Sequence, residues 1–181
     1  MTAVDELRTQ RLVLRRWHDG DRAAFHELNA DPLVMATIGP VMSRAESDAF
    51  LDRIRQRFDE QGFGLWCVDL DGEALGFTGL AVPWFREGVE VGWRIRSPYW
   101  GNGYAPEAAT ACLGVAFDVL ALDEVISFTA ATNVNSQRVM QKLGLVRDLD
   151  GDFEHPSVPL GSGLRPHVLY RITRDQYGRA R

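Results

Sequence analysis

The 181-residue chain has a single lysine, Lys142, so nearly all of its 20 basic side chains are arginines. Guanidinium groups keep their charge and bind phosphates and carboxylates through paired hydrogen bonds. Acidic residues outnumber the basic ones at 25, which gives a net charge of −5 at pH 7. This balance argues against a nucleic-acid partner and leaves room for a local basic patch that binds an anionic cofactor.

Cysteine is also scarce, with only Cys67 and Cys112 in the chain. Neither has C-x-x-C or Cys/His spacing, so we expect two core thiols and no metal site. The sequence contains no H-E-x-x-H motif and no Ser-His-Asp nucleophile elbow. These absences disfavour a zinc hydrolase and an enzyme that forms a covalent acyl intermediate.

Long apolar runs are missing as well. The beginning of the chain shows no basic start followed by an apolar segment, and no stretch approaches the about 20 residues that span a membrane. We therefore expect a cytoplasmic protein with no membrane partner. A hydrophobic content of 45% suits one well-formed core, so residues 1–181 are predicted to form a single domain.

The most informative segment runs from Tyr99 to Glu107 and reads Y-W-G-N-G-Y-A-P-E. It follows the strand-like residues 89–95 and precedes a predicted helix whose first residue is Pro106. Two glycines before a helix N-terminus can direct backbone amides toward an anion, and Glu107 complements the positive helix end. A structural turn remains the alternative, because neither a third glycine nor a Gly-Lys-Ser/Thr sequence is present.

Further patterns outline the other elements. Alternation around Leu12 and Leu14 predicts a first strand over 11–16, and Ser43-Arg44-Ala45-Glu46 has the spacing of a capping box for a helix that ends at Gly62. Asp71-Gly72 predicts a two-residue hairpin between strands 65–70 and 74–80.

The second half of the chain is predicted to alternate helices and strands. A helix is expected over 106–121, a strand over 125–130, a helix over 136–143 and a last strand over 168–173. Residues 148–167 are rich in glycine and proline and are predicted to be one long irregular segment. A glycine inside a strand often marks a bulge, so Gly92 is expected to be one.

Three of these segments resemble one family. Residues 100–105 are similar to the acyl-CoA-binding motif of the GNAT N-acetyltransferases, R/Q-x-x-G-x-G/A, although Trp100 stands where the family has Arg or Gln. Asn133 to Leu145 resembles the family signature N-x-x-S/A…K-L-G-F. Residues 9–15, together with the pattern Tyr-Trp-Gly-x-Gly-Tyr-Ala at 99–105, resemble the RimJ/RimL-like branch. This branch is named for N-terminal acetyltransferases of ribosomal proteins.

The resemblance implies the α/β GNAT acyl-CoA N-acyltransferase fold, a mixed and mostly antiparallel sheet flanked by helices. In that fold strands 89–95 and 125–130 run parallel and splay apart, and the pantetheine arm of acetyl-CoA pairs with the backbone groups left free. The cofactor-binding residues implied are Trp93, Arg94, Ile95, Trp100, Gly101, Asn102, Gly103, Tyr104, Ala105, Asn133 and Ser136.

Catalytic residues are predicted by combining the resemblance with chemistry. Most GNAT enzymes place a tyrosine acid seven residues after the motif asparagine, which here is Met140, so Ser136 is the expected proton donor to sulfur. Glu90 is the first choice of base if burial raises its pKa, with Glu154 or His155 as competitors. The structural alternatives are that Asn133 or Ser136 caps a helix and that Glu90 faces solvent.

The predicted function is direct transfer of an acetyl group from acetyl-CoA to a primary amine, and the RimJ/RimL resemblance implies a protein N-terminal amine. The alternatives are a small-molecule acceptor, such as an aminoglycoside, polyamine or amino acid, and an acyl-CoA-binding module without turnover. Trp84 and Phe85 follow Pro83 in a turn and are expected to border the acceptor entrance. The protein is expected to be a monomer or a homodimer.

Overall fold

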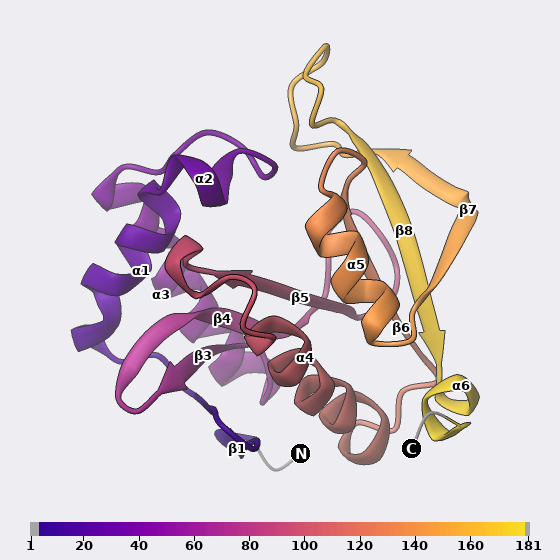
Figure 1. The fold of residues 1–181 in the computed structure, drawn as a ribbon, viewed down its shortest axis with the longest axis horizontal. Helices are drawn as coiled ribbons and strands as arrows, with labels where there is room; N and C mark the ends of the chain where they lie inside the picture. Colours follow the sequence, from indigo (N-terminus) through magenta and orange to yellow (C-terminus); the bar gives the residue numbers. More distant parts are fainter. Residues whose placement is uncertain (1–3, 180–181) are drawn as a thin grey trace.

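The computed structural model describes residues 4–179 and contains one eight-stranded sheet with helices on both faces (Figure 1). The strands lie in the order β1-β2-β3-β4-β5-β6-β8-β7. Their bounds are β1 Glu6–Arg8, β2 Val13–Arg15, β3 Leu65–Leu70, β4 Glu73–Ala81, β5 Glu90–Ile95, β6 Glu124–Ala130, β7 Val146–Glu154 and β8 Pro166–Thr173. Every neighbouring pair is antiparallel except β5 and β6, which run parallel.

The helices are α1 Arg22–Ala30, α2 Pro32–Met35, α3 Arg44–Gln61, α4 Tyr104–Gly114, α5 Val134–Lys142 and α6 Arg174–Arg179. Short helical turns precede α1 at Asp19–Asp21 and α4 at Ser97–Tyr99, and a π-helical turn, Val115–Val119, continues α4. Among residues 4–179, no helix has both the length and the apolar character needed to cross a bilayer.

Adjacent residues of a strand point to opposite faces of the sheet, and this alternation divides the core in two. Val91 and Ile95 of β5 pack with α4 residues in one cluster of buried side chains. Phe77 of β4 belongs to the second cluster, which contains Phe25 of α1 and Leu51 of α3. The two predicted core thiols are confirmed, because Cys67 and Cys112 are free and fully buried.

Local signals in the sequence set several element boundaries as predicted. Ser43 accepts a hydrogen bond from the Glu46 amide, and the Glu46 carboxylate accepts one from the Ser43 amide, which forms the capping box of α3. Gly62 ends that helix in the left-handed conformation at φ 74°. Asp71 and Gly72 both have positive φ, 53° and 90°, as a tight hairpin between β3 and β4 requires.

The prediction of one long irregular segment over 148–167 is wrong for its first part. Residues 146–154 form β7, which pairs with β8 at the edge of the sheet. Most of the side chains of β7 are exposed or half-buried, so the strand lacks the apolar alternation that reveals an inner strand. A register shift between Asp148 and Phe153 accommodates the extra residues.

Two further predictions need correction. The register of β5 with β4 is uninterrupted from Glu90 to Ile95, so Gly92 is not a bulge. Helix α4 begins at Tyr104, with Gly103 as its cap, and Pro106 is its third residue. Proline is tolerated there because the first amides of a helix have no intrahelical partner.

Replacing Ser43 by alanine removes the hydroxyl that bonds the Glu46 amide and carboxylate. We expect the free energy of unfolding to fall by about 1 kcal/mol, the typical effect of losing an N-cap. Denaturant unfolding measures it, and Ser157→Ala is the control, because Ser157 is an exposed loop residue whose hydroxyl forms no hydrogen bond within residues 4–179. Equal losses in the two variants would contradict a role for the cap.

Candidate active site

Strands β5 and β6 separate soon after they meet, which confirms the splay. Their ladder has one residue pair, Glu90 with Ile126, and the Ile126 amide donates to the Val89 carbonyl at 2.9 Å. The buried Ser127 hydroxyl then donates to the Val91 carbonyl at 2.8 Å. Beyond that bond the two strands share no residue pair.

The separation leaves backbone groups of β5 without a strand partner. The carbonyls of Val89 and Val91 point toward β6, so by alternation the N–H and C=O groups of Trp93 and Ile95 also point that way. The Ile95 carbonyl is taken by the Trp100 indole at 2.7 Å. The Trp93 N–H and C=O and the Ile95 N–H therefore face the gap, where an extended ligand can pair with them.

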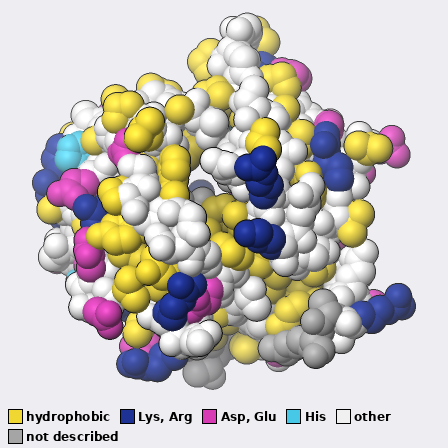
Figure 2. Space-filling model, viewed as in Figure 1, with side chains coloured by type: hydrophobic (Ala, Val, Ile, Leu, Met, Phe, Trp, Pro, Cys, Tyr) yellow, Lys and Arg dark blue, Asp and Glu magenta, His cyan; other side chains and the backbone are white. Residues whose placement is uncertain are grey.

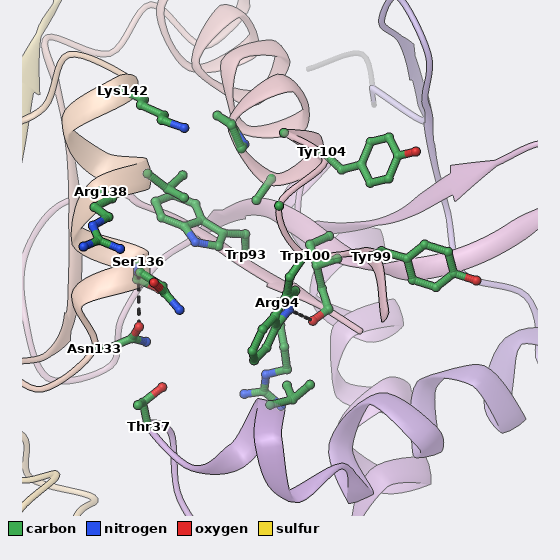
Figure 3. A pocket seen from close by; sticks show the side chains of 18 of the residues that line it. Thr37, Trp93, Arg94, Tyr99, Trp100, Tyr104, Asn133, Ser136, Arg138 and Lys142 are labelled. Carbon is green, nitrogen blue, oxygen red and sulfur yellow. Dashed lines mark hydrogen bonds between the residues drawn. The ribbon is translucent and has the colours of Figure 1, made fainter. Parts of the chain in front are cut away.

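A cavity of about 400 Å³ occupies this region, and Figure 2 shows the hollow beside α5, with apolar side chains inside and basic ones on its edge. Ten of the twelve predicted site residues line it: Trp93, Arg94, Ile95, Trp100, Gly101, Gly103, Tyr104, Ala105, Asn133 and Ser136. Glu90 and Asn102 are not among its lining residues. The cavity brings β5, the glycine loop and α5 together as Figure 3 shows.

The glycine loop has the conformation that its sequence predicts. Gly101 and Gly103 have φ values of 80° and 81°, which other residues adopt at a cost. The first backbone bond of α4 joins the Glu107 amide to the Gly103 carbonyl, so the amides of Tyr104 and Ala105 have no intrahelical acceptor. These amides and the helix dipole suit an anion such as a phosphate.

Two side chains hold this loop in shape. The Asn102 amide donates to the carbonyls of Tyr99 at 3.1 Å and Trp100 at 3.3 Å, so Asn102 turns back into the loop. Trp100, in the position of the family's Arg or Gln, donates its indole N–H to the Ile95 carbonyl of β5. The Nδ2 group of Asn102 is thus occupied within the loop.

Glu107 ties the start of α4 to the N-terminal segment. Its carboxylate accepts hydrogen bonds from the Thr9 hydroxyl at 2.6 Å and the Arg11 amide at 2.9 Å, and it pairs with the Arg11 guanidinium. These bonds hold the pKa of Glu107 below its usual value, against the opposing effect of burial. The Glu107 charge is therefore neutralised by Arg11 and leaves the helix end attractive to an anion.

Helix α5 supplies the other wall. Asn133 is its N-cap, and its Oδ1 accepts the Ser136 amide at 3.1 Å, so the structural alternative for Asn133 is observed (Figure 3). Ser136 is not the cap, and its hydroxyl has no hydrogen-bond partner within residues 4–179. Met140, in the position of the family tyrosine, is buried in the core and has no proton to donate.

Sequence reasoning missed two cations of this wall. Arg138 and Lys142 lie one turn apart on α5 and line the cavity (Figure 3). Arg138 and Lys142 are four residues apart in a segment that resembles the family signature. This spacing could have indicated that both lie on one face of the helix. Thr37, which lies after α2 and has no local motif, also lines the cavity and could be found only from the structure.

Glu90 lies on β5, on the face opposite α4. A methyl group added to Gly92 would contact Glu90 Oε1 at 3.5 Å, so the carboxyl leans over the open glycine position. Glu90 is only partly exposed, and its side chain forms no hydrogen bond or ion pair within residues 4–179. Desolvation raises the pKa of its carboxyl to about 8.

The two competing bases are engaged elsewhere. Glu154 pairs with Arg165 at 3.0 Å. His155 Nδ1 accepts a hydrogen bond from the Ser157 amide at 3.2 Å, which places the ring proton of the neutral imidazole on Nε2. Nε2 therefore cannot accept a proton from a substrate. Desolvation, with smaller effects from His167 and Arg165, lowers the pKa of His155.

His155 packs in an aromatic cluster with Phe85, Phe128, Phe153 and His167. Phe85 therefore packs against the sheet beside β6 and β7, whereas Trp84 is 72% exposed. The acceptor-entrance role of these two residues stays a prediction.

Residues 11–146 match the family model of the acetyltransferase (GNAT) domain. The chain belongs to the GNAT acetyltransferase family. FsC-acetyl coenzyme A-N(2)-transacetylase of Aspergillus fumigatus is 32% identical over 97% of this chain and 79% of its own length. The uncharacterized N-acetyltransferase YnaD of Bacillus subtilis is 28% identical over 93% of this chain and 97% of its own length.

Solved GNAT structures have the same architecture. The crystal structure of a GNAT-family acetyltransferase from Bacillus anthracis superposes with a TM-score of 0.79 and 27% identity, covering 94% of this chain and 99% of the other. The predicted GNAT fold is thus confirmed, and the chain is an acyltransferase of the N-acetyltransferase type. Within that family, the cavity between β5, the glycine loop and α5 is the candidate active site.

The raised pKa of Glu90 predicts a pH-dependent stability. The unfolded state ionises this carboxyl near 4.5, whereas the folded state keeps its proton up to about pH 8. Ionisation therefore favours the unfolded state progressively between these values, and the loss of stability levels off above them. Glu90→Gln has no carboxyl to ionise at this position. The melting temperature of the variant, measured relative to the wild type, should therefore increase as the pH rises from 5 to 8.

The control is Glu87→Gln, which makes the same change at an exposed residue three positions away. Its melting temperature should keep a constant difference from the wild type. A constant difference for Glu90→Gln as well would show that the Glu90 carboxyl is not desolvated.

Proposed function

We propose that the protein transfers an acetyl group from acetyl-CoA directly to a primary amine. The observation that carries the proposal is a continuous cavity that joins the amides of the glycine loop to unpaired backbone groups of β5. The Aspergillus fumigatus relative, whose name includes acetyl coenzyme A and an N(2)-transacetylase activity, supports the same cofactor and reaction class.

The chain has a place for each part of the cofactor. The diphosphate would accept hydrogen bonds from backbone amides between Gly101 and Ala105, and Arg138 and Lys142 would add positive charge from α5. The pantetheine arm would pair with Trp93 and Ile95 in the gap as an added strand does. Because the groups of β5 are held by the β4 pairing, they need little reorganisation on binding.

The chemistry follows from what surrounds the gap. The amine attacks the thioester carbonyl in its neutral form and loses a proton from nitrogen as the amide bond forms, and Glu90 accepts this proton through a water molecule. Backbone N–H groups of Trp93 or Ile95 stabilise the oxyanion that forms. The Ser136 hydroxyl, which has no hydrogen-bond partner within residues 4–179, donates a proton to the departing thiolate. Ser136 then regains a proton through water as Glu90 gives up the one that it accepted. The acetyl group passes from sulfur to nitrogen without forming a bond to the enzyme.

The acceptor is the open part of this proposal. Resemblance to the RimJ/RimL-like branch favours an N-terminal amine of a protein, and a small-molecule amine is the alternative. A GNAT module that binds acyl-CoA without turnover is the second candidate function, favoured by Met140 in place of the family tyrosine.

Acetyl-CoA should raise the melting temperature of the protein, and the protein should release CoA when an acceptor amine is added. Gly101→Ala forces a residue with a side chain into φ 80°, at a cost of about 1–2 kcal/mol. We expect its Kd for acetyl-CoA to rise about tenfold by calorimetry.

Gly163→Ala is the control, because Gly163 lies in a distant loop with open space around it and no positive φ. Protection by acetyl-CoA without CoA release from any amine would favour the binding module. No protection at all would contradict both functions.

The reaction rate should depend on the ionisation of Glu90. A base with a pKa of about 8 is mostly protonated at pH 6, so kcat/KM should rise with pH and level off above about pH 8. The test uses a weakly basic amine that stays neutral over this range, so that the inflection belongs to the enzyme. Glu90→Gln should lower kcat/KM about 100-fold or more and abolish the inflection.

Glu87→Gln should keep the wild-type profile. Ser136→Ala should lower kcat in the same assay. Wild-type rates in both Glu90→Gln and Ser136→Ala would exclude these two catalytic roles.

A further inference from the structure

Arg94 is a cation held on the face of β5 that carries Glu90. Its guanidinium donates a hydrogen bond to Asn29 Oδ1 and lies over the rings of Phe77, at 5.2 Å, and Phe50, at 5.9 Å. In Figure 3 the side chain extends from β5 toward α2, on the side of the cavity where Thr37 lies. Aromatic faces stabilise a cation but supply no hydrogen-bond acceptor in the plane of the guanidinium.

The position of Arg94 is fixed by a buried amide. Asn29 is fully buried, and its Nδ2 donates to the Phe25 carbonyl at 2.8 Å and to Ser47 Oγ at 3.1 Å. These two bonds set the orientation of the amide, so Oδ1 must face Arg94. The guanidinium is therefore held in place before any ligand arrives.

This cation lacks a counter-charge. No carboxylate within residues 4–179 forms an ion pair with Arg94, and its Nε is buried without a hydrogen-bond partner. Its neighbours from α1, α3 and β4 are a neutral amide and two apolar rings. Burial lowers the pKa of Arg94 to about 10, which reflects the cost of its charge. An anion bound here would offset that cost.

The proposed site for the cofactor diphosphate lies on the other face of β5 from Arg94. The glycine loop leads into α4, which packs on the face of β5 that carries Val91 and Ile95. Arg94 points to the opposite face, toward α1 and α3. The cavity that Arg94 lines connects these two sides. An anionic group at Arg94 therefore belongs to the acceptor.

We propose that Arg94 binds the carboxylate of the acceptor, and that the acceptor is an amino acid or a closely related amino carboxylate. This inference rests on the proposed acetyl transfer and names its substrate class. Gly92 lies between Glu90 and Arg94 on the same face of β5, and because it has no side chain the Glu90 carboxyl leans over it. The ammonium group would face Glu90 while the carboxylate pairs with the guanidinium.

The same charges discriminate against the other acceptors. A polyamine would bring positive charge next to an unpaired guanidinium, which disfavours its binding. An N-terminal peptide has an amide where an amino acid has its carboxylate, so it offers Arg94 only a neutral acceptor. The experiment includes a polyamine and a peptide, so it can identify either one as the preferred acceptor.

The experiment compares each of several amino acids with its carboxamide in a CoA-release assay, with spermidine and a short peptide as further acceptors. The wild type should prefer the carboxylate about tenfold to a hundredfold in kcat/KM, after correction for the fraction of neutral amine. Arg94→Gln should lose this preference, because its kcat/KM should fall much more with the carboxylates than with the carboxamides. Arg94→Lys should recover part of it, because lysine keeps the charge without the planar fork.

Arg53→Gln is the matched control, since Arg53 is exposed and lies over the Phe50 ring at 5.8 Å. It should retain the wild-type preference. An equal carboxylate preference in wild type and Arg94→Gln would overturn the proposal, as would a preference for spermidine or the peptide.

A binding measurement separates this inference from the proposed function. Calorimetry with N-acetylated amino acids and CoA tests the carboxylate site without turnover, on protein whose melting temperature shows that it is folded. Binding to the wild type that weakens at least tenfold in Arg94→Gln supports the site even if no amine releases CoA. Equal binding to both proteins, or none to the wild type, refutes it, whatever the turnover assay shows.

Discussion

The parting of β5 from β6 after a single residue pair is the constraint on which the rest of the site depends. A regular ladder would have used the Trp93 and Ile95 backbone groups and closed the sheet. Two side chains stabilise the opened form: the Ser127 hydroxyl takes the Val91 carbonyl, and the Trp100 indole takes the Ile95 carbonyl. The groups left over are those that an extended ligand needs.

The gap also separates two kinds of electrostatic environment. On the side of α4 the glycine loop with its free amides borders the cavity, and the nearby Glu107 charge is matched by Arg11. On the other face Glu90 and Arg94 share one strand, and neither has an ion-pair partner within residues 4–179. A cation without an ion-pair partner and a desolvated carboxyl both destabilise a fold, so their retention here is more consistent with a ligand site than with a structural role.

Much of the fold could be predicted because local signals agreed with the tertiary structure. The Ser43 capping box, the Asp71-Gly72 hairpin and the glycine loop each depend on residues only a few positions apart. Strand β7 could not be predicted, since an edge strand of exposed polar residues carries no hydrophobic alternation. The cavity-lining role of Thr37 and the isolation of Arg94 arise from distant segments, which no local pattern reports.

The glycine loop owes its position to a contact across the chain. Thr9 and Arg11 reach Glu107 over sequence separations of 98 and 96 residues. Contacts between such distant segments form only after the entropy of closing a long stretch of chain has been overcome. An excised peptide that contained only this turn would lack the anchor. The conformation of the glycine loop therefore depends on the segment between β1 and β2 being in place beside the start of α4.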